Sequence, residues 1–220
     1  PCNWDGSLYT FEDTVTVNVP DHAFADGVCT GCGAACEHPG YEDGVCTQCG
    51  EICVHTFADG ACTTCGMTGG YCGASTNEGG EQSVIWTLAD NHLVISGTGA
   101  MADSYYEDLP WWDSHQTITD LTIGEGVTHI GKHAFFDFRS VTEITIPASV
   151  ETIGDRVFEF STALETVTFE EGSRLSSLGY MPFSDCDSLT AISIPESVTA
   201  YKTIDGVLYS GDGTTLLYCP

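Results

Sequence analysis

Residues 121–131, with the sequence LTIGEGVTHIG, are the first copy of a phrase that the chain repeats. The phrase returns as ITIPASVETIG at 144–154 and as VTFEEGSRLSSLG at 167–179, and a fourth copy starts as ISIPESV at 192–198. Successive copies begin 23, 23 and 25 residues apart. A period of about 20–29 residues is typical of leucine-rich repeats, in which each copy forms one coil of a solenoid.

Apolar residues keep the same positions in every copy. Each copy starts apolar–polar–apolar, which predicts a short strand with one buried face. One coil cannot bury its apolar side alone, so the coils must stack to make a core, and we expect a mainly β solenoid. The equivalent apolar positions are Leu121, Ile144, Val167 and Ile192; Ile123, Ile146, Phe169 and Ile194; Val127, Val150, Leu175 and Val198; Ile130, Ile153 and Leu178; Phe135, Phe158 and Phe183; and Val141, Leu164 and Leu189.

A longer pattern, I-P-x-S-V-x-x-I-G-x-x-x-F-x-x-C/S-x-x-L, is carried by residues 146–164 and in part by residues 183–189. This pattern resembles the BspA-type leucine-rich repeats, and the resemblance extends over about residues 72–220. It implies a right-handed solenoid with turns or short helices on the convex side. It also implies a secreted or cell-surface bacterial protein that binds protein or glycan on host or neighbouring cells.

The third copy departs from the pattern, because EEGSR at 170–174 replaces the proline turn. In addition, Phe138 and Ser161 stand where the last coil has Cys186, and neither change should break the coil. The chain starts at Pro1 without a Met, so we expect a segment of a larger protein. The expected parts are the tail of a preceding module (1–20), three zinc-knuckle-like repeats (21–71), a β cap (72–117), the BspA-type repeats (118–200) and a hairpin leading to further repeats (201–220).

A different repeat occupies the cysteine-rich start of the chain, as D-G-x-C-x-x-C-G at 26–33, 43–50 and 59–66. The Asp-Gly pair suits the turn of a two-residue hairpin. A His precedes each copy, and three thiolates with one imidazole make a closed, structural Zn²⁺ site without an open position for catalysis. We therefore predict two or three structural zinc ions. The predicted ligands are Cys36, His38, Cys46 and Cys49; Cys53, His55, Cys62 and Cys65; and, in an incomplete site, His22, Cys29 and Cys32, with Cys2 as a candidate fourth ligand.

Two alternatives to this zinc assignment stay open. A second register groups Cys29, Cys32, Cys36 and His38, and repeats that grouping in the next copy. Disulfide bonds are the other interpretation of these cysteines, since secreted chains with clustered cysteines commonly form them. Zinc is favoured because the histidines recur in phase with the cysteines, which disulfides do not require.

The charge excludes several classes of partner. The chain has 32 acidic against 5 basic residues, a formal charge of −27, and all five bases lie after residue 131. Phosphate backbones and anionic lipid surfaces repel such a polyanion, so we expect no nucleic-acid binding. No apolar run reaches the length of about 18 residues that a membrane span needs, so we expect no membrane insertion.

The sequence carries no signature of an enzyme. No nucleophile elbow or phosphate-binding loop is present, and Gly97-Thr-Gly99 and Gly124-Glu-Gly126 lie in strand contexts. His129 and His133 are four residues apart, but on a strand and turn rather than a helix, so solvated surface is the favoured interpretation. We therefore expect a non-catalytic segment.

Two surfaces are candidates for ligand binding. Strand alternation points Thr122, Thr145, Thr168 and Ser193 outward as a hydroxyl face, with Asp120 and Glu143 beside it. Trp111 and Trp112, with Tyr105 and Tyr106, offer aromatic rings for stacking. The alternatives are ordinary solvated strands for the first surface and a cap on the first coil for the second. Adhesion or ligand binding is the favoured function, against a passive spacer or an accessory module of a larger secreted hydrolase.

Overall fold

The computed structural model describes residues 60–61, 68–74 and 84–219 in full, and elsewhere only the backbone of the two-residue strands β1 to β8. The chain divides into two compact units, residues 1–56 with 62–67 and residues 57–61 with 68–220, and each is treated by itself. No helix in the described part has the length and apolar character that a membrane crossing requires.

The described backbone of the first unit contains three pairs of short antiparallel strands. In β3–β4 and β5–β6 only an Asp-Gly pair separates the strands in sequence, which is the hairpin spacing expected for the repeats. Most predicted zinc ligands lie outside the described residues, and for Cys29, Cys46 and Cys62 only the backbone is described. The strands are β1 (Tyr9–Thr10) with β2 (Thr16–Val17), β3 (Phe24–Ala25) with β4 (Val28–Cys29), and β5 (Tyr41–Glu42) with β6 (Val45–Cys46).

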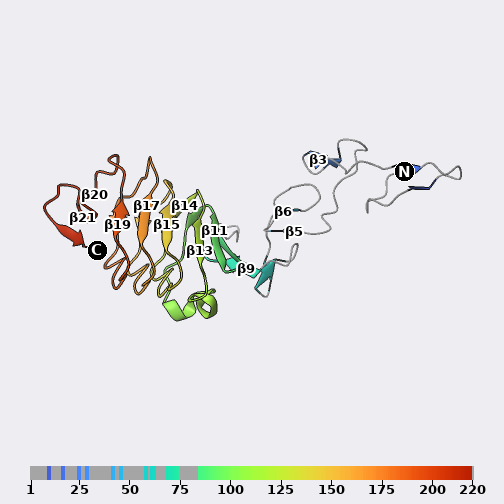
Figure 1. The fold of residues 1–220 in the computed structure, drawn as a ribbon, viewed down its shortest axis with the longest axis horizontal. Helices are drawn as coiled ribbons and strands as arrows, with labels where there is room; N and C mark the ends of the chain where they lie inside the picture. Colours follow the sequence, from blue (N-terminus) through green and yellow to red (C-terminus); the bar gives the residue numbers. More distant parts are fainter. Residues whose placement is uncertain are drawn as a thin grey trace. The chain divides into compact units, whose positions relative to one another are not determined.

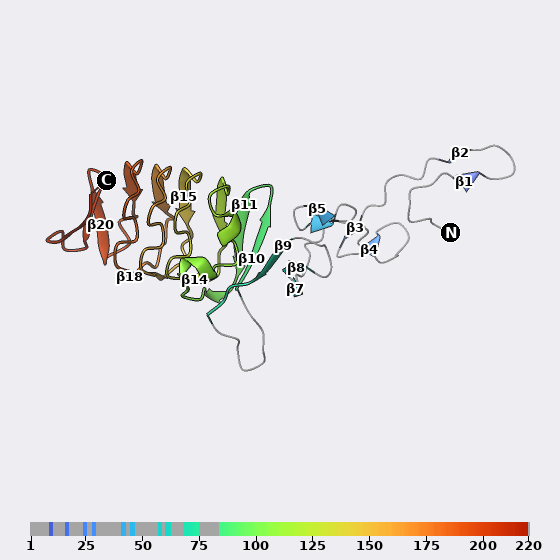
Figure 2. The same ribbon diagram turned by 90° about the horizontal axis from the view of Figure 1, so that it is seen from below.

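The second unit begins with a sheet that covers the start of the solenoid (Figures 1 and 2). Its strand order is β13-β11-β10-β9-β8-β7; the pairs from β8 to β11 are antiparallel, and β11–β13 is parallel. The β10–β11 hairpin turns through Asp90 and Asn91, which both have positive φ, as a type I′ turn requires. The strands are β7 (Phe57–Ala58), β8 (Ala61–Cys62), β9 (Thr68–Tyr71), β10 (Val84–Ala89), β11 (His92–Gly97) and β13 (Asp120–Ile123).

Two parallel sheets then run along the coils, as the repeat predicts. The predicted ladder is confirmed for Ile144, Val167 and Ile192, which are direct partners in neighbouring strands. Leu121 pairs instead with Leu93 of β11, and among residues 84–219 no strand pairing joins β13 to β15. One sheet contains β15 (Glu143–Ile146), β17 (Thr166–Phe169) and β19 (Ala191–Ser193), and the other contains β12 (Gly99–Ala100), β14 (Val127–Ile130), β16 (Thr152–Ile153) and β18 (Ser177–Leu178).

Turns, rather than α-helices, complete each coil in the described residues. The only helical elements there are two 3-10 turns before the first coil, η1 (Tyr106–Asp108) and η2 (Trp112–Ser114), seen as green coils in Figure 1. After the last coil the chain forms an antiparallel sheet of β20 (Tyr201–Ile204), β21 (Val207–Ser210) and β22 (Leu216–Tyr218).

A column of phenylalanines fills the centre of the coils. The rings of Phe135, Phe158 and Phe183 follow one another at centroid distances of 5.3 and 5.9 Å, and all three are buried. Beside them, the Ser161 hydroxyl donates to the Phe135 carbonyl at 3.1 Å, and the Cys186 thiol donates to the Phe158 carbonyl at 3.0 Å. Ser161 and Cys186 thus each donate a hydrogen bond to the preceding coil, whereas buried Phe138 fills the equivalent position of the first coil.

A second column consists of glycines at the point where neighbouring coils touch backbone to backbone. A Cβ on Gly154 would lie 2.6 Å from the Lys132 nitrogen, a Cβ on Gly179 would collide with the backbone of Gly154, and a Cβ on Gly131 would collide with the backbone of Ala102, which precedes the first coil. Real Cβ atoms do not approach backbone that closely, so only glycine fits these positions.

Candidate binding surface

The hydroxyl face expected from strand alternation is present. Thr122, Thr145, Thr168 and Ser193 are all exposed, while the residues between them point into the core. A column of short hydroxyl side chains thus follows the outer face of β13, β15, β17 and β19.

A groove interrupts this face where β13 and β15 are not paired. Its volume is about 410 Å³, and it is lined by side chains from both strands together with His92 of β11 and Glu170 at the end of β17. Both Thr122 and Thr145 line it, whereas Thr168 does not. The missing strand pairing therefore turns part of a flat sheet face into a concave one.

The groove is acidic and rich in hydrogen-bonding groups. Asp120, Glu143 and Glu170 supply carboxylates, and none of the five basic residues of the chain lines it. A ring nitrogen of His92 lies 2.8 Å from the Thr122 hydroxyl. The Glu170 carboxylate accepts the Ala148 N–H at 3.2 Å, which fixes its position. Such a lining favours a ligand with cationic or donor groups.

The structure corrects the expectation that Trp111 offers a surface for stacking. Trp111 is 2% exposed, its indole N–H donates to the Ala134 carbonyl at 2.9 Å, and its ring contacts Trp86 and Phe135. Trp111 therefore caps the first coil and has no face for a ligand. Trp112 is half-buried and stacks on His115 at a centroid distance of 3.8 Å, so its ring is also engaged within the chain.

His133 differs from the expected solvated surface as well. It is 6% exposed, its Nδ1 lies 3.1 Å from the Ser104 carbonyl, and Tyr105 and Tyr106 contact its ring. His129 is half-buried, with ring nitrogens 2.6 Å from the Thr152 hydroxyl and 3.4 Å from Asp103. These two histidines tie the segment before the coils to the coils themselves.

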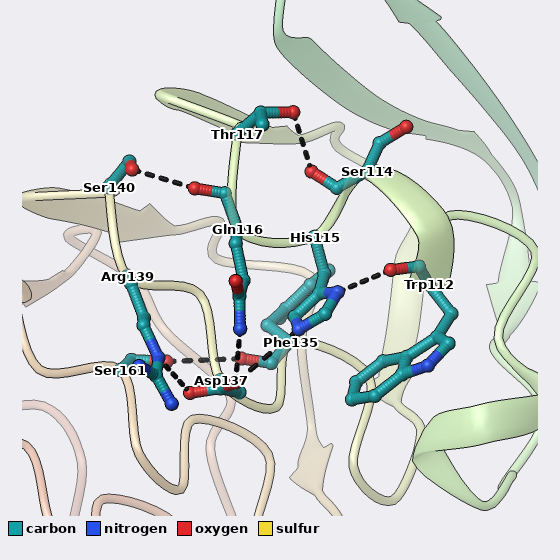
Figure 3. A network of polar contacts seen from close by, with 10 residues as sticks. All are labelled: Trp112, Ser114, His115, Gln116, Thr117, Phe135, Asp137, Arg139, Ser140 and Ser161. Carbon is teal, nitrogen blue, oxygen red and sulfur yellow. Dashed lines mark hydrogen bonds and ion pairs between the residues drawn. The ribbon is translucent and has the colours of Figure 1, made fainter.

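A polar network around Asp137 has no motif in the sequence that would have predicted it (Figure 3). The Asp137 carboxylate accepts from Arg139 at 2.6 Å and from Gln116 at 2.9 Å, and His115 lies 3.4 Å away. The other ring nitrogen of His115 contacts the Trp112 carbonyl. Burial alone raises the pKa of Asp137, but the hydrogen bonds from Arg139 and Gln116 outweigh it, and the net pKa is below the ordinary value.

This network holds residues 115–116, which precede β13, against the first coil. His115 and Gln116 precede β13, and Asp137 follows β14. They meet although 22 and 21 residues separate them from Asp137 in the sequence. The side chains of His115, Gln116, Asp137 and Arg139 all engage one another or the backbone, so the network has the character of a structural tie.

Two of the described cysteines, Cys72 and Cys186, are shielded inside the fold. Burial raises the pKa of the Cys72 and Cys186 thiols to about 12, which leaves them protonated at neutral pH. Within the described residues, no group of three or more His, Cys, Asp or Glu side chains could hold a metal ion. The predicted zinc ligands stay a prediction.

Comparison with known proteins agrees with this architecture. Residues 112–204 match the BspA type leucine rich repeat region, in six copies. No curated protein matches the chain.

Three solved structures are similar over about two thirds of the chain. A leucine-rich repeat protein from Eubacterium ventriosum is 22% identical, with a TM-score of 0.46, and the match covers 64% of this chain and 49% of that one. The pneumococcal vaccine antigen PcpA is 19% identical (TM-score 0.38; 68% and 57% covered), and a leucine rich cell surface protein from Faecalibacterium prausnitzii is 20% identical (TM-score 0.25; 64% and 60% covered).

The chain spans about half the length of the Eubacterium structure. The matching family model, the repeat period and the stacked parallel strands agree that residues 112–204 are similar to the BspA-type leucine-rich repeats.

Proposed function

We propose that this chain is a non-catalytic part of a secreted or cell-surface protein, and that its solenoid binds a protein ligand on host or neighbouring cells. The groove between β13 and β15 is the observation that carries this proposal. It gathers hydroxyl and carboxylate side chains from β13, from β15 and from Glu170, which follows β17, into one concave site of about 410 Å³. The resemblance to BspA-type repeats over residues 112–204 supports the extracellular location.

The chemistry of the groove favours a protein over a glycan. Asp120, Glu143 and Glu170 complement lysine or arginine side chains, and apart from His92 no aromatic ring lines the groove for a sugar to stack on. Threonine hydroxyls can both donate and accept, so they suit backbone and side-chain amides of a bound segment. Binding of glycans alone would therefore contradict this assignment.

The test is binding of the full chain to arrays of extracellular-matrix proteins, host-cell glycoproteins and isolated glycans. We expect a hit among basic proteins, and at least tenfold weaker binding after Thr122→Ala with Thr145→Ala. Thr168→Ala is the matched control, because Thr168 has the same type and exposure but lies outside the groove. If no array member binds, the passive spacer is the better function. A hydrolase domain elsewhere in the full open reading frame would instead support the accessory module.

We also propose that the repeats in residues 21–71 hold two or three structural zinc ions. The spacing of cysteine and histidine supports this, and the strand pairs β3–β4 and β5–β6 agree with the expected hairpins. Mass measurement under native and denaturing conditions should show two or three zinc ions lost on denaturation. Losses of two hydrogens per cysteine pair, without metal, would establish disulfides instead.

A further inference from the structure

Backbone hydrogen bonds join the strands of the hydroxyl face to their neighbours at both ends of β11–β13 and of β15–β17, but not at the groove. Among residues 84–219, no backbone hydrogen bond joins β13 to β15 at either end. The bonds at the other two places run from the N–H of Thr119 to the carbonyl of Asn91 (2.9 Å) and from Gly124 to Ile95 (2.8 Å) for β11–β13, and from Glu165 to Thr142 (2.7 Å) and from Glu170 to Ile146 (3.0 Å) for β15–β17.

Pro147 explains the missing bond at one end of the groove. It occupies the position that Gly124 and Glu170 occupy in the neighbouring copies, and proline has no N–H to donate to the Ile123 carbonyl. The two coils stay joined on their other side, where β14 pairs with β16. The groove is therefore a local opening inside the array, with β11 paired to β13 on one side and β17 paired to β15 on the other.

Four backbone N–H groups face this opening. Successive residues of a strand direct their backbone groups to opposite neighbours, so Leu121 and Ile123 face β15, and Glu143 and Thr145 face β13. None of the four N–H groups has an acceptor among residues 84–219. All four residues line the groove, and Leu121 and Ile123 are buried. An unpaired buried N–H costs about 1–3 kcal/mol, so the opening favours a ligand that supplies carbonyls.

We propose that the groove binds its protein ligand through an extended basic segment, which enters between β13 and β15 as an additional strand. This inference rests on the proposed function and names the form that the ligand takes. An extended backbone offers N–H and carbonyl groups along both of its edges, so it complements both open strands. Paired strands lie about 4.8 Å apart, so β13 and β15 must separate to about 9.6 Å while β14 and β16 stay paired.

The lining of the groove defines the side chains of the segment. Alternate residues point outward beside Asp120, Glu143 and Glu170, where lysine or arginine finds complementary charge. The residues between them point inward beside the buried Leu121 and Ile123, where small apolar side chains fit. The first 131 residues of this chain contain no Lys or Arg, so that part of the chain does not supply such a segment.

The probe is a labelled peptide, KAKAKAK, with blocked ends, measured at physiological ionic strength. A matched peptide that is N-methylated on every alanine keeps the charge and loses the N–H groups along one edge. We expect the full chain to bind KAKAKAK, and to bind the methylated peptide at least tenfold more weakly. Glu143→Lys should also weaken binding at least tenfold. Glu165→Lys is the matched control, because Glu165 is equally an exposed acid but lies outside the groove.

Amide hydrogen exchange at single residues supplies a direct readout. In the free chain, the four N–H groups that face the opening should exchange at least tenfold faster than those of Glu165 and Glu170, which are bonded to the preceding coil. Saturating KAKAKAK should slow exchange of the four groups at least tenfold and leave Glu165 and Glu170 unchanged. The inference is overturned if the peptide does not bind at millimolar concentration, or if it binds without protecting the four groups.

Failure of this inference can be distinguished from failure of the proposed function. If basic proteins bind in a manner that depends on Thr122 and Thr145, but the two peptides bind equally well, the additional strand is wrong and the proposed function stands. If neither the proteins nor KAKAKAK bind, both are wrong.

Discussion

Replacing Phe158 by alanine should cost the solenoid more than any other single aromatic truncation in the second coil. Phe158 is 1% exposed and its ring lies between those of Phe135 and Phe183. Truncation of a buried phenylalanine costs about 3–5 kcal/mol, and each aromatic pair adds about 0.5–1.5 kcal/mol beyond burial. Two pairs are lost here, so we expect a loss in the upper part of that 3–5 kcal/mol range, about 4–5 kcal/mol, in the free energy of unfolding.

Phe160→Ala is the matched control for this prediction. Phe160 belongs to the same coil but is 41% exposed and has one aromatic neighbour, Phe136, at 5.6 Å. Its truncation should cost about 1 kcal/mol, because little buried surface is removed.

Urea unfolding followed by near-ultraviolet circular dichroism measures both variants, since the buried aromatic rings report on packing of the coils. A melting experiment should show a drop of about 8–20 °C for Phe158→Ala, at about 2–4 °C for each kcal/mol in a unit of this size. If Phe158→Ala costs less than about 1.5 kcal/mol, or no more than Phe160→Ala, the phenylalanine column does not hold the coils together.

Three further predictions follow from the described contacts. Gly154→Ala should lower the urea midpoint strongly, because its Cβ would meet backbone, whereas Gly73→Ala, with ordinary contacts at 3.4 Å or more, should change it little. The Cys186 thiol, with its pKa raised to about 12 by burial, should react with iodoacetamide only after unfolding, as peptide mapping would show; fast labelling in the folded state would contradict its burial. The lowered pKa of Asp137 means that its ionised form stabilises the fold above pH about 4, and that this contribution is lost as the pH falls through the folded-state pKa. Wild type and Asp137→Asn should therefore differ most in urea midpoint near neutral pH and converge toward pH 3. An equal difference at both pH values would refute the idea that the ionised Asp137 carboxylate stabilises the fold.

Much of the fold follows from the sequence because the repeat imposes it. The period and the alternation around Ile144, Val167 and Ile192 determine which residues pair and which face is buried. The outward position of Thr122 and Thr145 follows from the same alternation, so half of the candidate groove was predictable.

The rest of the groove could not be predicted, because its shape depends on the absence of strand pairing between β13 and β15. Leu121 starts its copy of the repeat as Ile144 does, yet β13 pairs with β11 and leaves a groove beside β15. The burial of Trp111 depends on an acceptor, the Ala134 carbonyl, that only the folded first coil supplies. The Asp137 network joins residues with no shared motif, and only the folded chain brings them together.

The glycine column has a consequence for how such a protein can change in length. Because Gly131, Gly154 and Gly179 are the places where one coil rests directly on another, growth or shrinkage must proceed in whole units that each carry such a glycine. The two additional residues of the third copy are accommodated because the copy still reaches Gly179 in step, with the surplus near residues 170–174. A duplication that did not place a glycine at this position would put a side chain between the backbones of two neighbouring coils and force the coils apart.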